Sequence, residues 1–348
     1  MQESRRRFIV NGASAIALLG LTSAARAESD AELYAAAKKE GVVNWYTGLL
    51  QNQIVRPLIA GFEKKYPGLS VAVVGGRDTD LLVKIMTEVK ARKLQADLID
   101  GPSMAGEVIQ AGLAAPYAAA NAANVPAQFK DPNGLWTAPT LFFITAAVNT
   151  NLVKAGQEPK SLNDLLDPKW RGKIAWSGEM STAGPVGFIG AILHTLGEQQ
   201  GKAYLQQLAQ QRIATIPSNP RVVLDQVITG EYAIGLAIYN HHAVASSAKG
   251  APVRWIALEP MVATMARSVL LKGAPHPNGA KLLINYLLSP VGQQVFRDAG
   301  YIPSVSTVQP KDPTLKLDSA RHKVFAPTPA EELRDMKQWV GLYKEWFQ

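Results

Sequence analysis

The sequence predicts an α/β fold with two doubly wound lobes joined by hinge strands. Short β-branched runs alternate with amphipathic helical patterns, and turns containing Gly or Pro separate them over most of the 348 residues. A chain of that length has room for two domains of ordinary size. One apolar run, residues 136–149, is long for a single strand, so we expect it to cross from one lobe to the other.

The apolar periodicity predicts each element in turn. In the first part of the chain it predicts helices at 31–39, 54–66, 81–93 and 104–111, and strands at 42–48, 69–74 and 96–100. In the second part it predicts helices at 161–166, from the turn at 181–185 through 208, and at 222–229, 278–288, 290–299 and 330–346. The run 168–177 continues this α/β pattern, and strands are predicted at 213–216 and 232–239, with the segments 253–255 and 261–271 leading back toward the first lobe.

In a doubly wound sheet the ligand lies at the carboxyl ends of the parallel strands. Three such ends fall in the first lobe and are expected to converge on one crevice: Tyr46-Thr47-Gly48, Gly76-Arg77-Asp78 and Gly101-Pro102-Ser103. Tyr46 is the aromatic side chain most expected in the cleft, because it ends a strand.

The turn at Gly75-Gly76 has the features of an anion site. Asp78 or Thr79 is placed to cap the following helix, whose free N–H groups and positive dipole end attract anions. Arg77 beside the turn is a candidate two-pronged clamp for a carboxylate or phosphate. The alternative is that the glycines only make a tight turn and that Arg77 is solvated.

The second lobe offers a matching set of candidates. Ser177, Ser181 and Thr182 precede a predicted helix, where they are ligand contacts or caps. Arg221 is a second possible anion clamp or a surface charge. If the strand through Tyr239 continues, His241 points with Tyr239 while His242 points to the other side, and a turn there removes this constraint.

Composition narrows the function classes. The formal charge is +8, and the leader, residues 1–27, contributes three of these charges, which leaves about +5. This mild positive field suits an anionic ligand. No basic run longer than three residues follows the leader, so nucleic-acid binding is not predicted. The absence of cysteine excludes disulfides, thiolate metal sites and cysteine nucleophiles.

Residues 1–27 have the pattern of an export signal. Arg5 and Arg6 precede a short apolar run that ends in Ala25-Arg26-Ala27, a small-x-small cleavage pattern. The arginine pair resembles the twin-arginine export signal, and an ordinary secretory leader with a basic start is the alternative. By either route we expect a periplasmic protein that begins near Glu28.

The ordered set of motifs resembles the periplasmic solute-binding proteins of ABC importers, in the branch that includes the ferric-ion-binding proteins. The motifs that carry this resemblance are Val43-x-Trp45-Tyr46-Thr47-Gly48, Phe62-Glu63-Lys64-Lys65-Tyr66-Pro67-Gly68, Gln95-Ala96-Asp97-Leu98, Ala111-Gly112-Leu113, Val148-Asn149-Thr150, Asp167-Pro168-Lys169-Trp170-Arg171-Gly172-Lys173-Ile174, Gly230-Glu231-Tyr232-Ala233-Ile234-Gly235 and Pro275-His276-Pro277-Asn278-Gly279-Ala280.

The resemblance implies two lobes that close on a solute like a hinge. The expected bounds are 28–143 plus 262–310 for the first lobe and 144–261 plus 311–348 for the second. It also implies an inner-membrane ABC permease as the partner, a monomer, no cofactor and no enzymatic activity.

The ferric ligands of that branch are not matched here. Its histidine after the first strand is replaced by Gly48-Leu49-Leu50-Gln51, its glutamate by Gly101-Pro102-Ser103, and its tyrosine pair by Tyr239-Asn240-His241-His242. Ferric iron prefers hard anionic oxygens over neutral imidazoles. We therefore expect a small anionic organic solute and no metal, with ferric iron as the alternative. A periplasmic enzyme and the ligand-binding partner of a sensor are further alternatives.

Overall fold

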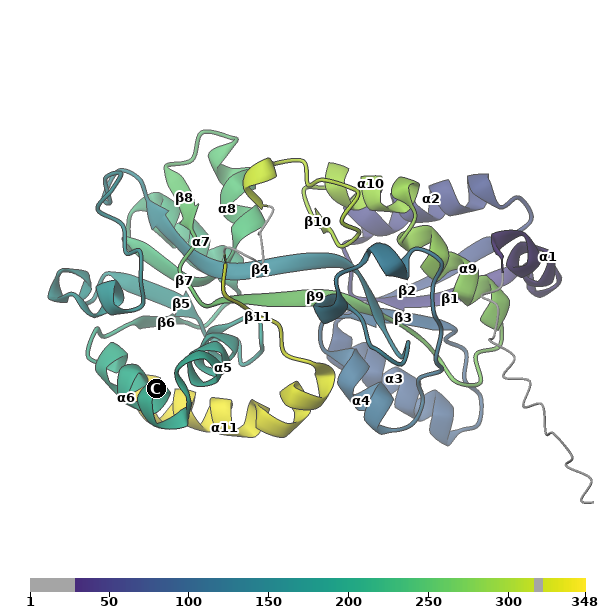
Figure 1. Cartoon of the computed structure of the whole chain (residues 1–348), viewed down its shortest axis with the longest axis horizontal. Coiled ribbons are helices and arrows are strands. Elements are labelled where there is room, and N and C mark those ends of the chain that lie inside the picture. The colour runs from purple at the N-terminus through teal and green to yellow at the C-terminus, as the bar shows by residue number, and fades with distance from the viewer. Residues whose placement is uncertain (1–28, 316–321) are drawn as a thin grey trace, which may run out of the picture.

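The computed structural model describes residues 29–315 and 322–348, so the leader lies outside the described residues. Within these ranges, eleven strands form one sheet whose main order is β2-β1-β3-β9-β4-β7-β5-β6 (Figure 1). The strands are β1 (Val42–Thr47), β2 (Ser70–Gly75), β3 (Leu98–Gly101), β4 (Thr137–Asn149), β5 (Ile174–Ser177), β6 (Ala214–Ile216), β7 (Ile234–Tyr239), β8 (Val253–Ile256), β9 (Met261–Leu270), β10 (Ile302–Pro303) and β11 (Val324–Phe325).

Eleven α-helices of the described part pack around this sheet. They are α1 (Asp30–Glu40), α2 (Arg56–Lys65), α3 (Asp78–Lys90), α4 (Met104–Gln110), α5 (Pro185–Leu196), α6 (Glu198–Ala209), α7 (Pro220–Thr229), α8 (Asn240–Ser247), α9 (Pro277–Leu287), α10 (Pro290–Asp298) and α11 (Pro329–Phe347). No helix among these residues is long and apolar enough to cross a membrane.

Two long antiparallel strands connect two groups of parallel strands within this sheet. β1 pairs in parallel with β2 and β3, and β5 pairs in parallel with β6 and β7. Between these groups, β9 pairs with β3 and β4, and β4 continues into pairing with β7 and β8. The apolar run at 136–149 thus forms the single strand β4, which crosses from one group of parallel strands to the other, as expected from its length.

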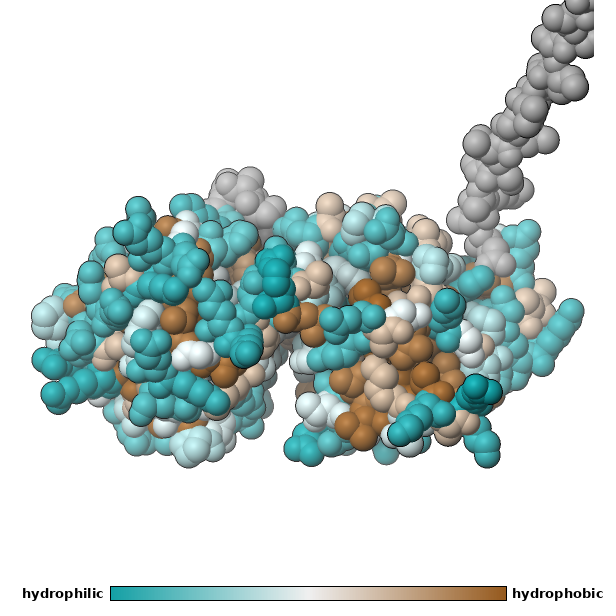
Figure 2. All heavy atoms as spheres, turned by 90° about the horizontal axis from the view of Figure 1, so that it is seen from below, coloured by the Kyte–Doolittle hydropathy of each residue, from teal (hydrophilic) through white to brown (hydrophobic). Residues whose placement is uncertain are grey.

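The buried side chains divide into separate cores on either side of this crossing. The first core takes residues from 33 to 143 and again from 263 to 315, and we call the part around it the N-lobe. The main second core takes residues from 144 to 262 and from 325 to 343, and with a smaller adjoining cluster it defines the C-lobe. Figure 2 shows a notch between the two lobes. The fold is therefore the two-lobed α/β arrangement that the sequence predicts.

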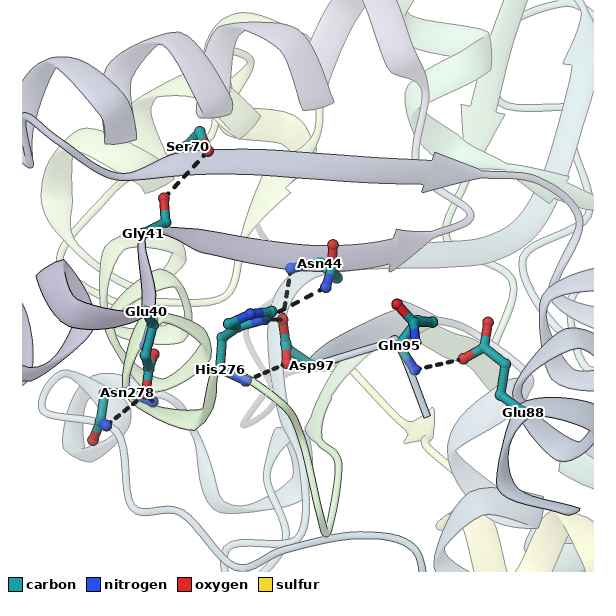
Figure 3. Close-up of polar contacts among 10 residues, drawn as sticks. Glu40, Gly41, Asn44, Ser70, Glu88, Gln95, Asp97, His276 and Asn278 are labelled. Atoms are coloured by element: carbon teal, nitrogen blue, oxygen red, sulfur yellow. Dashed lines mark hydrogen bonds and ion pairs between the residues drawn. The ribbon is translucent and has the colours of Figure 1, made fainter. Parts of the chain in front are cut away.

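A polar network closes the N-lobe at the amino ends of its strands (Figure 3). The buried Asp97 carboxylate accepts hydrogen bonds from the backbone of Asn44 and of His276, each at 2.7 Å, and from His276 Nδ1 at 2.9 Å. Glu40, the last residue of α1, accepts from Asn278 Nδ2 at 2.7 Å near the start of α9. The contact between Asp97 and His276 joins segments more than 170 residues apart in the chain. It lies at the amino ends of the N-lobe strands, whereas the candidate site described below lies at their carboxyl ends.

One local prediction is wrong, and the structure settles two further details. The segment predicted as a helix at 161–166 forms only a short 3₁₀ turn, Asn163–Leu166. A π-helical turn, Gln51–Val55, precedes α2. The strand β7 stops at Tyr239 and α8 begins at once, so His241 and His242 lie on one helical turn and the alternation of an extended strand does not apply to them.

Candidate functional site

A cavity of about 240 Å³ lies where the carboxyl ends of β1, β3 and β7 meet the middle of β4 and β9. Its wall combines backbone-rich turns with aromatic rings and imidazoles. The residues that line it are Gly48, Leu49, Leu50, Gly101, Pro102, Phe142, Tyr239, His241, His242, Thr264, Ala266 and Tyr301. Both lobes and both crossing strands contribute residues to this lining.

The Asp78 carboxylate organises the N-lobe wall of this cavity. It accepts from the backbone N–H of Ser103 at 2.7 Å and also from that of Met104, at the start of α4. A Cβ atom on Gly101 would lie 2.5–2.7 Å from three atoms of this carboxylate, and one on Gly48 would lie 2.5 Å from its Oδ1. Asp78 therefore holds the turns after β1, β2 and β3 together, and only glycine fits at the two contact points.

Asp78 does not act as the cap that we expected. We predicted that Asp78 or Thr79 would cap its own helix, but the N-cap residue of α3 is Arg77, and no side chain caps that helix. Both predicted caps are instead the first two residues of α3. Burial raises the pKa of Asp78 above its ordinary value, against the lowering effect of its bonds to the α4 backbone.

Asp100 is a fully buried carboxyl group at the end of β3. It accepts a hydrogen bond from Trp45 Nε1 at 2.6 Å and another from Thr47 Oγ1. Burial raises the pKa of Asp100 to about 7, against the lowering effect of these two bonds, and the nearby charge of Asp78 raises it further. Its position behind Gly101 places a group that titrates near neutral pH next to the cavity wall.

An aromatic cluster forms the opposite wall. The rings of His241 and His242 are 4.4 Å apart, and Tyr239 lies 5.5 Å and 5.1 Å from them. The ring of Tyr301 lies tilted against that of His241 with centroids 5.1 Å apart, and the ring of Phe142 lies edge-on to that of Tyr239 at 6.0 Å.

Both imidazoles are neutral in this setting. Burial lowers the pKa of His241 to about 3, helped by the neighbouring His242. Burial also lowers the pKa of His242 to about 4, and the charge of Arg221 adds to this effect. The Nδ1 atoms of both rings are buried without a hydrogen-bond partner among the described residues.

The start of α5 adds a second polar corner beside Tyr239. Its N-cap residue, Gly184, provides no side-chain cap, and the fully buried Ser177 Oγ has no hydrogen-bond partner in the described part of the chain. A Cβ atom on Gly184 would lie 3.5 Å from that hydroxyl. Thr182 is also buried, whereas Ser181 is half-buried. Unsatisfied N–H groups and a spare hydroxyl at a helix N-terminus favour an anionic group.

Neither predicted arginine clamp lines the cavity. The Arg77 side chain is 83% exposed and donates from Nε and Nη2 to the two carboxylate oxygens of Asp80, at 2.8 Å and 3.0 Å. Arg221 donates to Asp225 at 2.7 Å and to Ser246 at 2.9 Å. A local partner three or four residues along the helix satisfies each guanidinium, which sequence spacing alone did not resolve.

Of the fifteen predicted site residues, Gly48, Tyr239, His241 and His242 line the cavity. Tyr46 was expected in the cleft, but its hydroxyl donates to Glu88 at 2.7 Å and its side chain is buried in the N-lobe. Others stand behind the wall or beside the cavity and do not line it: Thr47, Gly76, Arg77, Asp78, Thr79, Ser103, Ser177, Ser181, Thr182 and Arg221.

The residues that we missed come mainly from the crossing strands and from the tail. Phe142, Thr264 and Ala266 lie on β4 and β9, and only the strand pairing shows that these side chains reach the cavity. Tyr301 lies just before β10 and carries no local signal for a binding role. Gly101 and Pro102 were not missed, because they belong to the strand end Gly101-Pro102-Ser103 that the sequence predicts at the crevice, and both line the cavity.

The described residues offer no close group of three His, Asp or Glu side chains for a metal ion. Two phenols and two imidazoles do meet at the cavity, through Tyr239, Tyr301, His241 and His242. Glu179 lies close enough to raise the pKa of Tyr239, and burial raises the pKa of Glu179 itself. The cavity is thus lined by neutral hydrogen-bonding groups and aromatic faces, with carboxyl groups behind them.

Several known proteins are similar to this chain in sequence or in architecture. The Fe(3+)-binding periplasmic protein of Serratia marcescens is 26% identical over 271 residues, which cover 76% of this chain and 78% of that protein. Iron-bound HitA from Pseudomonas aeruginosa matches with a TM-score of 0.71 and 24% identity, covering 88% of this chain and 99% of that one. AfuA from Actinobacillus pleuropneumoniae, with fructose-6-phosphate bound, matches with a TM-score of 0.70 and 23% identity over the same shares.

The family model described as bacterial extracellular solute-binding protein matches residues 94–324, which is more than half of the chain. The match includes β3, both crossing strands and the C-lobe side of the cavity. The chain therefore belongs to the bacterial extracellular solute-binding protein family and is a periplasmic solute-binding protein of the ABC-importer type.

Proposed function

We propose that this protein captures a small anionic organic solute in the cavity between its lobes and delivers it to an ABC permease in the inner membrane. One observation carries the choice of an anion: the buried, unpartnered Ser177 hydroxyl beside the uncapped start of α5. A phosphate or carboxylate bound there receives backbone N–H groups and this hydroxyl. Because Ser177 stands behind the cavity wall, the anionic group extends from the cavity to this corner, and the rest of the solute lies against the neutral rings of Tyr239, His241 and Tyr301.

The carboxyl groups near the cavity are compatible with this proposal. Burial raises the pKa of Glu179, and an added negative charge nearby favours its protonated form further. Asp78 is held by the α4 backbone, so its charge already has partners in the cavity wall.

A thermal-shift screen tests the solute class. The exported protein is heated with sugar phosphates, phosphonates, dicarboxylates, polyamines or ferric iron. A solute that binds only the folded state raises the melting temperature, by about 2.7 kcal/mol of stabilisation at a hundredfold excess over Kd. We expect one of the organic anions to do so. Stabilisation by polyamines or ferric iron alone contradicts the anionic assignment.

The variant Ser177→Ala then tests the site. Loss of one neutral hydrogen bond is expected to weaken the solute found by the screen by about 0.5–1.5 kcal/mol, measured by calorimetry. Ser70→Ala is a matched control, because Ser70 lies on the edge strand β2 and bonds only to the carbonyl of Gly41 at 3.3 Å (Figure 3). Equal affinities of both variants and the parent exclude Ser177 from the site.

Ferric iron is a second candidate, because the phenols of Tyr239 and Tyr301 meet the two imidazoles in the cavity. Phenolate is a hard anionic oxygen ligand of the kind that ferric iron prefers. If iron binds, titration with a ferric salt gives a visible phenolate-to-iron absorption band, and Tyr239→Phe reduces it. Absence of the band in the parent protein excludes this candidate.

We also propose the finer assignments that accompany this role. The protein acts as a monomer with no cofactor and no turnover of its solute. Its lobes are 28–143 plus 262–310 and 144–261 plus 311–348, close to the positions where the two cores divide. Export uses the twin-arginine route, which cell fractionation of an Arg5/Arg6-to-Lys variant tests, since unaltered export contradicts it.

A further inference from the structure

The C-terminal helix α11 lies along both lobes (Figure 1). Near its start, Leu333 lies against Gly106 of α4 in the N-lobe, with a Cβ atom on Gly106 only 3.2 Å from the Leu333 side chain. Farther along, Trp339 covers Gly190 of α5 in the C-lobe. The helix therefore connects the lobes in addition to β4 and β9, and a hinge motion has to change one of its two contacts.

A buried arginine fastens the start of α11. Arg267 of β9 is 1% exposed, and its guanidinium holds the Glu332 carboxylate by two bonds, from Nη1 at 3.2 Å and from Nη2 at 3.1 Å. Nη2 also donates to the carbonyl of Pro327 at 2.8 Å. The guanidinium lies over the ring of Trp136, 5.4 Å from its centroid. Because the planar guanidinium of Arg267 donates to several fixed acceptors, it is held in one orientation.

The same arginine reaches the cavity wall from behind. Nη1 donates to the carbonyl of Pro102 at 2.7 Å, and Pro102 lines the cavity. Ala266 and Thr264 on β9 also line it, and side chains alternate along a strand, so Arg267 points to the opposite face of the sheet. Arg267 therefore touches the loop that faces the solute but not the solute itself.

We propose that Arg267 and Glu332 form a joint that couples the position of α11 to the cavity loop and thereby sets how far the two lobes open. Arg267 is a positioning residue in this arrangement. A solute that binds a closed form gains or loses apparent affinity with the fraction of molecules able to close. Because the Arg267–Glu332 pair acts on that fraction, its effect on affinity does not depend on which solute binds. Only this effect on affinity rests on the proposed hinge-like capture.

Distances between spin labels test the joint without any solute. The chain contains no cysteine, so the double variant Val83→Cys, Gln207→Cys places one label on α3 of the N-lobe and one on α6 of the C-lobe. Both positions are exposed. In this background Glu332→Gln removes the charge while keeping the shape of the side chain. We expect the distribution of label distances to shift or widen relative to the parent.

Asp97→Asn is the matched control. It makes the same carboxylate-to-amide change at another buried acid with a basic partner, His276, at the far end of the N-lobe strands (Figure 3). We expect it to lower the melting temperature and to leave the label distances unchanged. If Glu332→Gln likewise lowers only the melting temperature, the pair is merely structural and the proposal is overturned.

A second variant covers poor folding of Glu332→Gln. Leu333→Ala removes the contact of α11 with α4 from a side chain that is already exposed, so the variant is expected to fold. It should move the label distances in the same direction as Glu332→Gln. Unchanged distances in Leu333→Ala show that α11 does not influence the opening. A failure to find an anionic solute leaves this test intact, because the labels report on the unliganded protein.

Discussion

Replacing Asp100 with asparagine should remove a pH-dependent loss of stability. The pKa of this carboxyl group is raised from 3.8 to about 7 in the folded protein, mainly by burial. Between these values the folded state holds a proton that the unfolded state releases. The resulting stabilisation is complete below the unfolded pKa and is lost as the pH rises through the folded one.

The size of the effect follows from the shift. Three pKa units at about 1.4 kcal/mol each make about 4 kcal/mol of unfolding free energy. Asparagine keeps the shape of the protonated acid: its oxygen accepts from Trp45 Nε1, and its NH₂ group faces Thr47 Oγ1, which donates in the parent and accepts in the variant. At pH 4 the Asp100→Asn variant should match the parent, and at pH 8 it should be more stable by up to about 4 kcal/mol.

Urea unfolding of both proteins at several pH values between 4 and 8 measures this difference directly. The difference between the two proteins is the quantity to follow, because the buried neutral His241 and His242 make the stability of both proteins rise with pH, opposite to the effect of Asp100. Asp298→Asn on the exposed face of α10 is the control and should stay within about 0.5 kcal/mol of the parent at every pH. A difference between Asp100→Asn and the parent that does not vary with pH refutes the reasoning.

Three further predictions concern the cavity and its surroundings. Gly101→Ala places a methyl group against the Asp78 carboxylate. It should therefore lower the unfolding free energy in urea by about 1–3 kcal/mol and weaken solute binding in calorimetry. Unchanged stability together with unchanged affinity contradicts the close contact between Gly101 and Asp78. Arg77→Ala removes only an exposed, solvent-screened pair with Asp80, so it should leave both the stability and the solute affinity close to those of the parent; a marked loss of affinity restores Arg77 to the site. His241→Phe keeps a ring but removes an imidazole whose lowered pKa makes the folded state lose stability as the pH falls below 6.5. The variant should therefore lose less stability than the parent between pH 7 and pH 5 in urea unfolding. Parallel curves of stability against pH argue against a buried neutral imidazole.

The sequence by itself determined the alternation of strands and helices, the single long crossing strand and the family. These features depend on local patterns: apolar periodicity, Gly and Pro at turns, and ordered short motifs. The carboxyl ends of the strands followed from the same patterns, which is why Gly48 and the segment from Tyr239 to His242 were found at the cavity.

Only the tertiary structure decided which side chains meet there. Arg77 was satisfied by Asp80 one helical turn away, whereas the Asp78 carboxylate crossed to the start of α4. Tyr301 and Arg267 act through partners that are tens to hundreds of residues distant in the chain. The direction of a side chain and the partner that it finds depend on long-range packing and burial, and local periodicity contains no information about either.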